Sequence, residues 1–362
     1  MHTNKGENSD IILKKNLSDL AVFGGPPGFS DSLHVGKPNI GDRAHLLKRI
    51  NDMLDRRWLT NAGTYVKEFE QKLSKHLGVR HCIAMCNGTV ALEIAIRALG
   101  MSGEVIVPSF TFVATAHALQ WQEITPVFCD IDPATYNIDC TQIEALITPR
   151  TTGIVAVHLW GRPCDTDALK KIAQRHGLKL IFDAAHALGC SFGGRMIGGF
   201  GDAEVFSFHA TKFINSSEGG AVATNDDELA HRIRLMKNFG FAGFDKVIHI
   251  GTNGKMPESS AAMGLTSLES IEKFVGQNRA NYRTYEQQLN GVPGIKLMQF
   301  DECEQNNYQY IVIELDTDII GMSRDTILDI LHAENIIARR YFYPGCHAME
   351  PYRSSQPHAD LQ

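Results

Sequence analysis

The sequence has 362 residues, of which 43% are hydrophobic and 21% are charged. At about 150 residues per domain, this length is typical of two domains with a sizeable core, and the composition excludes a disordered chain, a collagen and a coiled coil. The 35 basic and 41 acidic residues give a formal charge of −6 without a basic run, so we expect no nucleic-acid partner.

The sequence shows no export or membrane segment and no clustered cysteines. Residues 1–8 are mostly polar, and no uncharged apolar run approaches the roughly 18 residues of a membrane span. We therefore expect a cytoplasmic protein without membrane contact. The 8 cysteines form no Cys-x-x-Cys pair, which predicts mostly buried, free thiols and no metal site.

The N-terminal part of the chain, residues 1–45, is rich in Gly and Pro and is predicted to be an extended arm. Short apolar runs then alternate with helical patterns up to residue 224, and one such helix covers 90–99, with Gly100 at its C-terminal cap. Near-continuous apolar strands between helices predict a mostly parallel sheet that is covered on both faces. The seven expected strands are 81–86, 104–107, 126–129, 153–157, 178–182, 203–208 and 219–223.

The C-terminal part of the chain has the pattern of a second, smaller α+β unit. Long helices are predicted over 227–237 and 260–289, followed by a strand over 310–315 and a helix over 324–334. The fold class is therefore α/β with an additional α+β domain.

Residues that directly follow the strands are candidates for chemistry, because ligands bind beyond the carboxyl ends of parallel strands. The turn Asn87-Gly88-Thr89 opens a helix, where free N–H groups and the helix dipole favour a phosphate, although such a turn also needs Gly for its geometry. Asp183 follows the fifth strand; its carboxylate could hold a protonated ring nitrogen or cap a helix.

Two further candidates also follow strands. Lys212 comes soon after the sixth strand, where burial can lower the lysine pKa enough for a Schiff base, although a single lysine is usually a solvated surface charge. Phe112 follows the second strand and could stack on a flat cofactor or simply pack in the core.

The order of these candidates indicates pyridoxal 5'-phosphate. A phosphate-binding turn, an aromatic ring, a carboxylate and a lysine, each after a separate strand, are the groups that an enzyme needs to hold this cofactor. The acid keeps the pyridine nitrogen protonated, and the lysine binds the cofactor and then moves a proton as a base.

At these motifs the sequence resembles the DegT/DnrJ/EryC1/StrS family of nucleotide-sugar aminotransferases. The resemblance implies the aspartate-aminotransferase fold (pyridoxal phosphate fold type I), and it extends from about Trp58 to His347. The motifs that carry it are Asn87–Leu92, Val107–Thr115, Asp183–Ala187, Ser207–Lys212 and Glu218–Gly220.

The resemblance also implies roles for individual residues. Lys212 matches the Schiff-base lysine and Asp183 the partner of the pyridine nitrogen, so both are the expected catalytic residues. Asn253 matches an asparagine that reaches the phosphate of a neighbouring subunit, which implies a homodimer with shared active sites. The other cofactor positions are Ala185 under the ring, His186 at the ring hydroxyl, Phe112 as the stacking aromatic, and Gly88, Thr89 and Ser207 at the phosphate.

Three loop segments, 18–26, 158–164 and 343–347, are most similar to family members that aminate C4 of dTDP-4-keto-6-deoxyglucose, usually with glutamate as the donor. Alternatives are transfer to C3 of a keto sugar, transfer to a cyclitol ketone, or a protein that binds the cofactor without catalysis. Some relatives carry histidine in place of the lysine and act as sugar dehydratases, which Lys212 argues against.

The expected domain organisation follows the same resemblance. Residues 1–45 form an arm that contributes to the small domain, 46–245 form the large cofactor-binding domain, and 246–362 form the small C-terminal domain. Members of the family continue past the position of Leu361 by several tens of residues, so we expect the small domain to be incomplete in this sequence.

Overall fold

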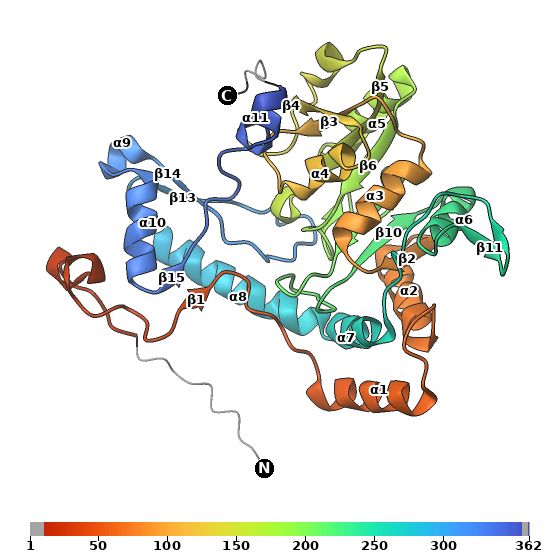
Figure 1. The fold of residues 1–362 in the computed structure, drawn as a ribbon. Helices are drawn as coiled ribbons and strands as arrows, with labels where there is room; N and C mark the ends of the chain where they lie inside the picture. Colours follow the sequence, from red (N-terminus) through yellow and green to blue (C-terminus); the bar gives the residue numbers. More distant parts are fainter. Residues whose placement is uncertain (1–10, 357–360, 362) are drawn as a thin grey trace. The chain divides into compact units, whose positions relative to one another are not determined.

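The computed structural model of the protein describes residues 11–356 and residue 361 (Figure 1). The polar start of the chain, residues 1–8, lies outside the described residues. The described residues pack as two compact units: one of residues 11–37, 283–299 and 311–341, the other of 38–282, 300–310 and 342–356 with residue 361. The domain boundaries expected at residues 46 and 246 stay a prediction.

The larger unit is built on a seven-stranded sheet in the order β2-β10-β9-β6-β5-β3-β4, and each strand corresponds to one of the seven expected runs. Only β10 runs antiparallel to its neighbours, β2 and β9, and the other pairings are parallel, so the prediction of a mostly parallel sheet is confirmed. The strands are β2 (His81–Met85), β3 (Glu104–Pro108), β4 (Thr125–Cys129), β5 (Thr151–Val157), β6 (Lys179–Asp183), β9 (Ala203–Ser207) and β10 (Gly220–Thr224).

Both faces of this sheet are buried, which is why its strands are apolar throughout. Successive side chains of a strand point to opposite faces. In β2, Ile83 and Met85 belong to the core packed against α3 (Gly88–Ala98), α4 (Ala114–Gln120) and α6 (Asp227–Met236). Cys82 and Ala84 belong to the core of the opposite face, with α2 (Thr64–Leu77) and α7 (Glu258–Leu268), while α5 (Thr166–His176) covers the neighbouring strands.

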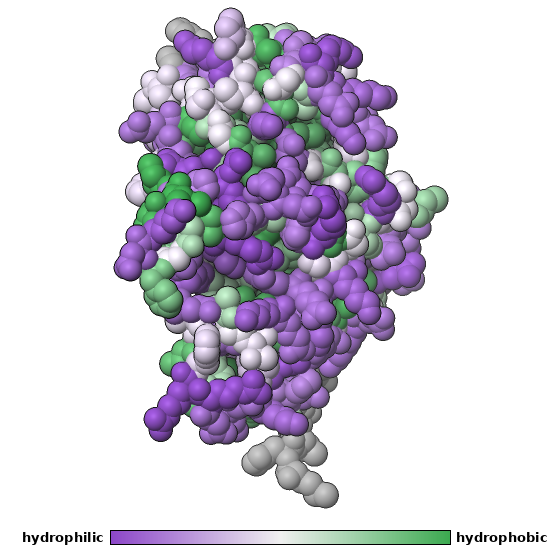
Figure 2. Space-filling view, turned by 90° about the vertical axis from the view of Figure 1, so that its right-hand side faces the viewer, coloured by the Kyte–Doolittle hydropathy of each residue, from purple (hydrophilic) through white to green (hydrophobic). Residues whose placement is uncertain are grey.

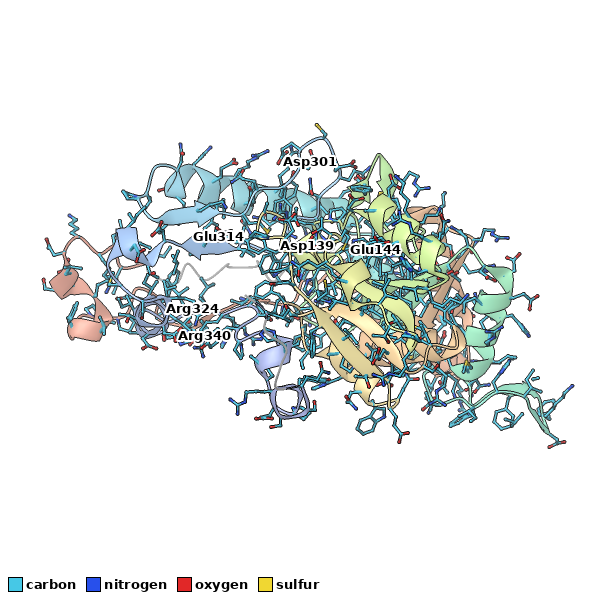
Figure 3. The ribbon with its side chains drawn as sticks, turned by 90° about the horizontal axis from the view of Figure 1, so that it is seen from above. Asp139, Glu144, Asp301, Glu314, Arg324 and Arg340 are labelled. Atoms are coloured by element: carbon cyan, nitrogen blue, oxygen red, sulfur yellow. The ribbon has the colours of Figure 1, made fainter. Side chains whose placement is uncertain are left out.

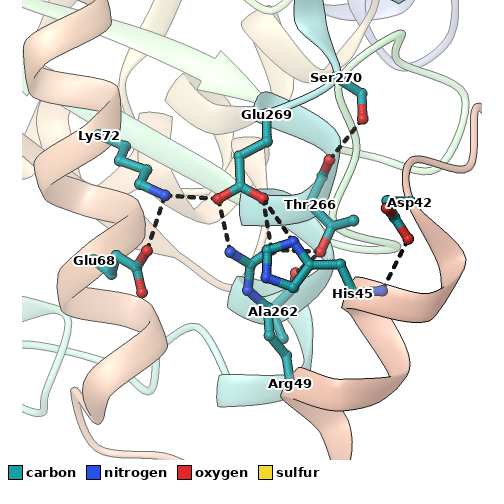
Figure 4. A network of polar contacts seen from close by, with 9 residues as sticks. All are labelled: Asp42, His45, Arg49, Glu68, Lys72, Ala262, Thr266, Glu269 and Ser270. Atoms are coloured by element: carbon teal, nitrogen blue, oxygen red, sulfur yellow. Dashed lines mark hydrogen bonds and ion pairs between the residues drawn. The ribbon is translucent and has the colours of Figure 1, made fainter.

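The helical region predicted over 260–289 is two helices, α7 and α8 (Ile271–Leu289), so a single long helix was wrong. At the break, Ser270 Oγ donates to the Thr266 carbonyl over 3.1 Å, a local bond that competes with the helical pattern. Glu269, also at the break, pairs with Arg49 of α1 (Arg43–Arg56) at 2.7 Å and with Lys72 of α2 at 2.6 Å (Figure 4).

The smaller unit is an α+β assembly of short elements. Residues 17–23 form two 3-10 turns (Leu17–Asp19 and Ala21–Phe23), so the prediction of an extended arm over residues 1–45 was wrong at these positions. The expected strand over 310–315 is shorter, β14 (Ile313–Leu315), and pairs with β13 (Ile295–Leu297), while β1 (Leu33–His34) pairs with β15 (Ile336–Ile337). The unit's helices are α9 (Thr317–Ile320) and α10 (Arg324–Ala333).

Ion pairs and hydrogen bonds of charged side chains connect neighbouring segments of the smaller unit. Arg324 and Arg340 both contact Asp325, at 2.9 and 3.1 Å, and Figure 3 labels the two arginines near one another. Glu334 accepts hydrogen bonds from the backbone N–H groups of Ala21 and Gly28, which ties the end of α10 to the N-terminal segment.

The remaining elements of the larger unit are short. The hairpin of β11 and β12 exposes large apolar side chains, including Phe241, Phe244 and Val247. Figure 2 turns the α6 and β11 side of Figure 1 toward the viewer and shows hydrophobic patches among hydrophilic side chains.

Across the described residues, no helix is long and apolar enough to cross a membrane. The short elements are β7 (Ser191–Phe192), β8 (Arg195–Met196), β11 (Phe241–Gly243), β12 (Lys246–Val247), α11 (Tyr352–Ser355) and the 3-10 turns Ile143–Leu146, Leu159–Gly161 and Cys346–Ala348.

All eight cysteines are free, and five of them are buried, as expected for small apolar core residues.

Candidate active site

Several candidate residues lie together at the carboxyl ends of the parallel strands of the large sheet. β2, β9 and β6 run in the same direction, because β2 and β9 are both antiparallel to β10 and β9 is parallel to β6. Asp183 ends β6, Ser207 ends β9, and Gly88 opens α3 after β2. The carboxyl ends of these strands therefore bring the residues to a common edge, which is where ligands bind in such sheets.

The turn before α3 is packed closely against the turn between β9 and β10. A Cβ atom on Gly88 would lie 3.1 Å from Ser207 Cβ, and one on Gly220 would lie 2.6 Å from Gly88 N. The Asn87 side chain accepts from Val90 N at 2.8 Å, while the N–H groups of Gly88 and Thr89 have no acceptor among the described residues. These two N–H groups at a helix start form a cradle that suits a phosphate.

Asp183 is held at the end of β6 by two donors. Thr115 Oγ1 donates to Asp183 Oδ2 at 2.9 Å, and Ala185 N donates to Oδ1 at 3.1 Å. Burial raises the pKa of Asp183, whereas the two hydrogen bonds and the charge of Lys212 oppose that rise. No helix begins at Asp183, so the reading of this residue as a helix cap was wrong.

Lys212 lies in the turn after β9 and is half-buried. Its Nζ donates a hydrogen bond to the Tyr310 hydroxyl at 3.2 Å. Burial lowers the pKa of Lys212 to about 8, although the Asp183 charge raises it. At pH 7, roughly one amine in ten is then neutral and nucleophilic, which a solvated lysine does not achieve.

His186 is a buried histidine whose proton position is fixed by its surroundings. Its Nδ1 lies 3.2 Å from Trp160 N and accepts that backbone hydrogen. Burial and the nearby Lys212 charge hold the pKa of His186 well below its usual value, so the ring is neutral. With Nδ1 as acceptor, the single ring proton is on Nε2, and that N–H can donate to a ligand.

The other predicted residues occupy separate positions. Phe112 is 55% exposed, and its ring lies 6.4 Å from that of Phe342, so the reading of Phe112 as a core residue was wrong. Ala185 is half-buried, two residues after Asp183. Asn253 is exposed, forms a β-bridge with Asn238 and, within the described part of the same chain, makes no hydrogen bond to Lys212 or Asp183.

Several residues of this site were not identified from the sequence. Thr115 falls inside one of the family motifs, and its spacing of one helical turn from Thr111 was an available signal. Trp160 contributes only a backbone N–H, in a turn where its φ is 54°. Tyr310 is 98 positions from Lys212 along the chain, and no local pattern links the two.

Comparisons with known proteins agree with this arrangement. The sequence profile described as the DegT/DnrJ/EryC1/StrS aminotransferase family matches residues 41–362. The dTDP-4-amino-4,6-dideoxy-D-glucose transaminase of Escherichia coli is 39% identical over 325 residues, which cover 89% of this chain and 87% of that protein. The GDP-perosamine synthase of Caulobacter vibrioides is 36% identical, covering 83% and 82%.

Solved structures match the fold over most of its length. The structure of DesI in the presence of its TDP-sugar product has a TM-score of 0.92 at 52% identity and covers 96% of this chain and 88% of that one. The aminotransferase PseC of Helicobacter pylori, involved in pseudaminic acid biosynthesis, has a TM-score of 0.84 at 28% identity, covering 92% and 90%.

Proposed function

We propose that this chain, which belongs to the DegT/DnrJ/EryC1/StrS aminotransferase family, transfers an amino group from glutamate to C4 of dTDP-4-keto-6-deoxyglucose. This chain is therefore a pyridoxal phosphate-dependent sugar aminotransferase. The products of the proposed reaction are dTDP-4-amino-4,6-dideoxyglucose and 2-oxoglutarate. The observation that carries the proposal is the half-buried Lys212 in the turn after β9, near Asp183 at the end of β6, with the pKa of Lys212 lowered to about 8 by its surroundings.

The choice of sugar rests on the most similar relatives. A protein that is 39% identical over most of its length is named for the proposed product, and a 52% identical structure was solved with a TDP-sugar product. The GDP-perosamine synthases, at 33% to 36% identity, favour a second candidate, a GDP-linked 4-keto sugar.

The geometry fits pyridoxal phosphate. When bound, this cofactor supplies an electron-withdrawing ring that stabilises negative charge on the carbon next to the transferred nitrogen. Lys212 Nζ would hold the cofactor covalently and, once released, would take a proton from one carbon and return it to another. The Asp183 carboxylate, with Thr115 and Ala185 N as donors, would face the ring nitrogen and keep it protonated.

The remaining residues would orient the cofactor. The N–H groups of Gly88 and Thr89, together with Ser207, would bind the phosphate in the cradle before α3. The neutral His186 would donate its Nε2–H to the ring hydroxyl. The exposed Phe112 ring would cover one face of the cofactor, and the small Ala185 would leave room on the other.

We assign the second half of the phosphate site to another copy of this chain. In a homodimer, Asn253 of the partner subunit would reach the phosphate. The exposed apolar side chains of the β11–β12 hairpin come directly before this asparagine in the sequence, and apolar groups of this kind are typical of a protein contact.

The experiment is a screen of the purified protein with glutamate against dTDP- and GDP-linked 4-keto sugars and a 3-keto sugar. Mass spectrometry identifies the aminated product, and NMR identifies the carbon that carries nitrogen. The proposal predicts nitrogen at C4 of the dTDP sugar. Preferred turnover of the GDP sugar supports the second candidate, and nitrogen at C3 contradicts both.

A further inference from the structure

We propose that Tyr310 is a positioning residue for Lys212, which it holds through its hydroxyl while its ring packs against His186. This inference rests on the proposed function, because it concerns how the catalytic amine is aimed. Neither the family motifs nor the strand-end rule includes this tyrosine. The contacts of Tyr310 with Lys212 and His186 are formed only in the folded chain.

The contacts of Tyr310 join two groups of the site. Its hydroxyl lies 3.2 Å from Lys212 Nζ and is the one hydrogen-bond partner of that nitrogen within the described residues. Its ring lies 4.6 Å from the His186 ring, at an interplanar angle of 51°. A single rigid side chain therefore touches both the amine and the histidine.

The segment that carries Tyr310 is fixed to the same two turns. Asn307 is fully buried, and its Nδ2 donates to the carbonyls of His186 at 2.8 Å and Leu188 at 3.0 Å. The Gln309 amide contacts the backbone on either side of Lys212, at Thr211 O and Phe213 N, both at 3.5 Å. Residues 307–310 thus form a brace between the His186 turn and the Lys212 turn, and this brace sets where the Tyr310 hydroxyl lies.

This brace restricts the conformational freedom of the Lys212 side chain. The lysine side chain has several rotatable bonds, and fixing it costs conformational entropy. The amine must nevertheless be aimed whenever it is not bonded to the cofactor. A tyrosine hydroxyl accepts from an ammonium group and donates to a neutral amine, so Tyr310 can hold Nζ in both protonation states.

The charged and titratable groups facing Lys212 are Asp183, His186 and Tyr310. Asp183 acts on the amine through its charge and, among the described residues, makes no hydrogen bond to it. Removing the Tyr310 hydroxyl should therefore take away the direct partner of the ammonium form and leave the charge of Asp183 in place.

The test compares Tyr310→Phe with Tyr308→Phe in the full chain. Tyr308 is a matched control, because it belongs to the same brace but its hydroxyl bonds to Glu302. In the cofactor-free protein, the pH dependence of Lys212 acylation is followed by peptide mass spectrometry. We expect the midpoint to fall by about one pH unit in Tyr310→Phe, the size of a lost hydrogen bond to a charge, and to stay unchanged in Tyr308→Phe.

A second measurement uses the cofactor-loaded protein. Loss of positioning predicts a kcat about tenfold lower in Tyr310→Phe, with the KM for glutamate unchanged. A Tyr310→Phe protein whose acylation midpoint and kcat both equal those of wild type overturns the inference. Acylation needs no sugar substrate, so a shifted midpoint without turnover of any keto sugar contradicts the proposed function and leaves the Tyr310–Lys212 contact supported.

Discussion

Thr115 Oγ1 donates a hydrogen bond of 2.9 Å to Oδ2 of Asp183, and Thr115 is fully buried while Asp183 is half-buried. This bond connects the first turn of α4 to the last residue of β6. Burial alone raises the pKa of Asp183, and the hydroxyl of Thr115 lowers it again. The pKa of Asp183 is therefore raised by burial, and the hydrogen bonds from Ala185 N and Thr115 limit that rise.

Thr115→Val should weaken catalysis by removing this donor while keeping the shape of the side chain. With one donor fewer, the pKa of Asp183 rises, so the acidic limb of the pH–rate profile moves to higher pH. Hydrogen bonds to charged groups contribute about 1.5–3 kcal/mol, which corresponds to a loss of roughly 10- to 100-fold in kcat/KM. Thr115→Ser keeps the hydroxyl and should stay close to wild type; equal profiles for Val and wild type contradict the assigned role.

His186 should stay neutral over the whole working range of pH. Its pKa is held well below the usual value by burial and by Lys212, and Trp160 N occupies its Nδ1. Nitrogen-15 NMR of labelled histidine should show an Nε2–H tautomer that does not titrate between about pH 5 and 8. A His186 signal that titrates near the ordinary histidine value of about 6.5 rules out this arrangement.

Breaking the ion pair between Glu70 and Lys237, which both contact the backbone of Ala84 in β2, should destabilise the protein strongly. Glu70 accepts from Lys237 at 3.0 Å and from Arg234 at 2.8 Å, and Lys237 is 7% exposed. Its two cationic partners lower the pKa of Glu70 against the opposing effect of burial, whereas burial lowers the pKa of Lys237. Glu70→Ala leaves the Lys237 charge buried without its partner and should cost about 3–5 kcal/mol of unfolding free energy.

Urea unfolding measures this loss, and the double variant Glu70→Ala with Lys237→Met is the control. It removes both charges and should be more stable than Glu70→Ala alone. If the double variant is less stable than the single one, the uncompensated charge is not the cause of the loss.

Glu269 should make stability depend on pH in acid. Its pKa is lowered from 4.5 to about 2, with hydrogen bonds to Arg49 and Lys72 outweighing its burial. A carboxyl group whose folded pKa is depressed stabilises the protein above its unfolded pKa, and this stabilisation disappears as pH falls from about 4.5 to 2. The network in Figure 4 therefore contributes at neutral pH and is lost in acid.

The matched variant is Glu269→Gln, which keeps the size of the side chain. At pH 7 it should be about 1–3 kcal/mol less stable than wild type, because the network is partly exposed. The difference in Tm between the two proteins should shrink as the pH is lowered toward 3. A difference that is constant with pH excludes ionisation of Glu269 as its source.

The sequence predicted the sheet well because its strands are buried on both faces. Such strands form near-continuous apolar runs, and Asp183 and Lys212 stand out because they closely follow them. The strand-end rule therefore found the chemistry-bearing residues together with the sheet. Helix α1 escaped prediction because it buries only Arg49 and Met53 and so lacks a broad apolar stripe.

The contacts that complete the site could not be read from local patterns. The bond from Tyr310 to Lys212 and that from Trp160 N to His186 depend on the packing of distant segments. The break between α7 and α8 depends on the side chains of Ser270 and Glu269 finding partners in three dimensions, which a helical periodicity does not register.

The most direct test of the central claim is borohydride reduction of the protein loaded with pyridoxal phosphate, followed by peptide mass spectrometry. Reduction makes the bond between cofactor and lysine permanent, so the modified residue can be identified. The account predicts the added mass on the peptide that contains Lys212, with no attachment in a Lys212→Ala protein. Attachment to a different lysine, or the same labelling in the Lys212→Ala protein, contradicts it.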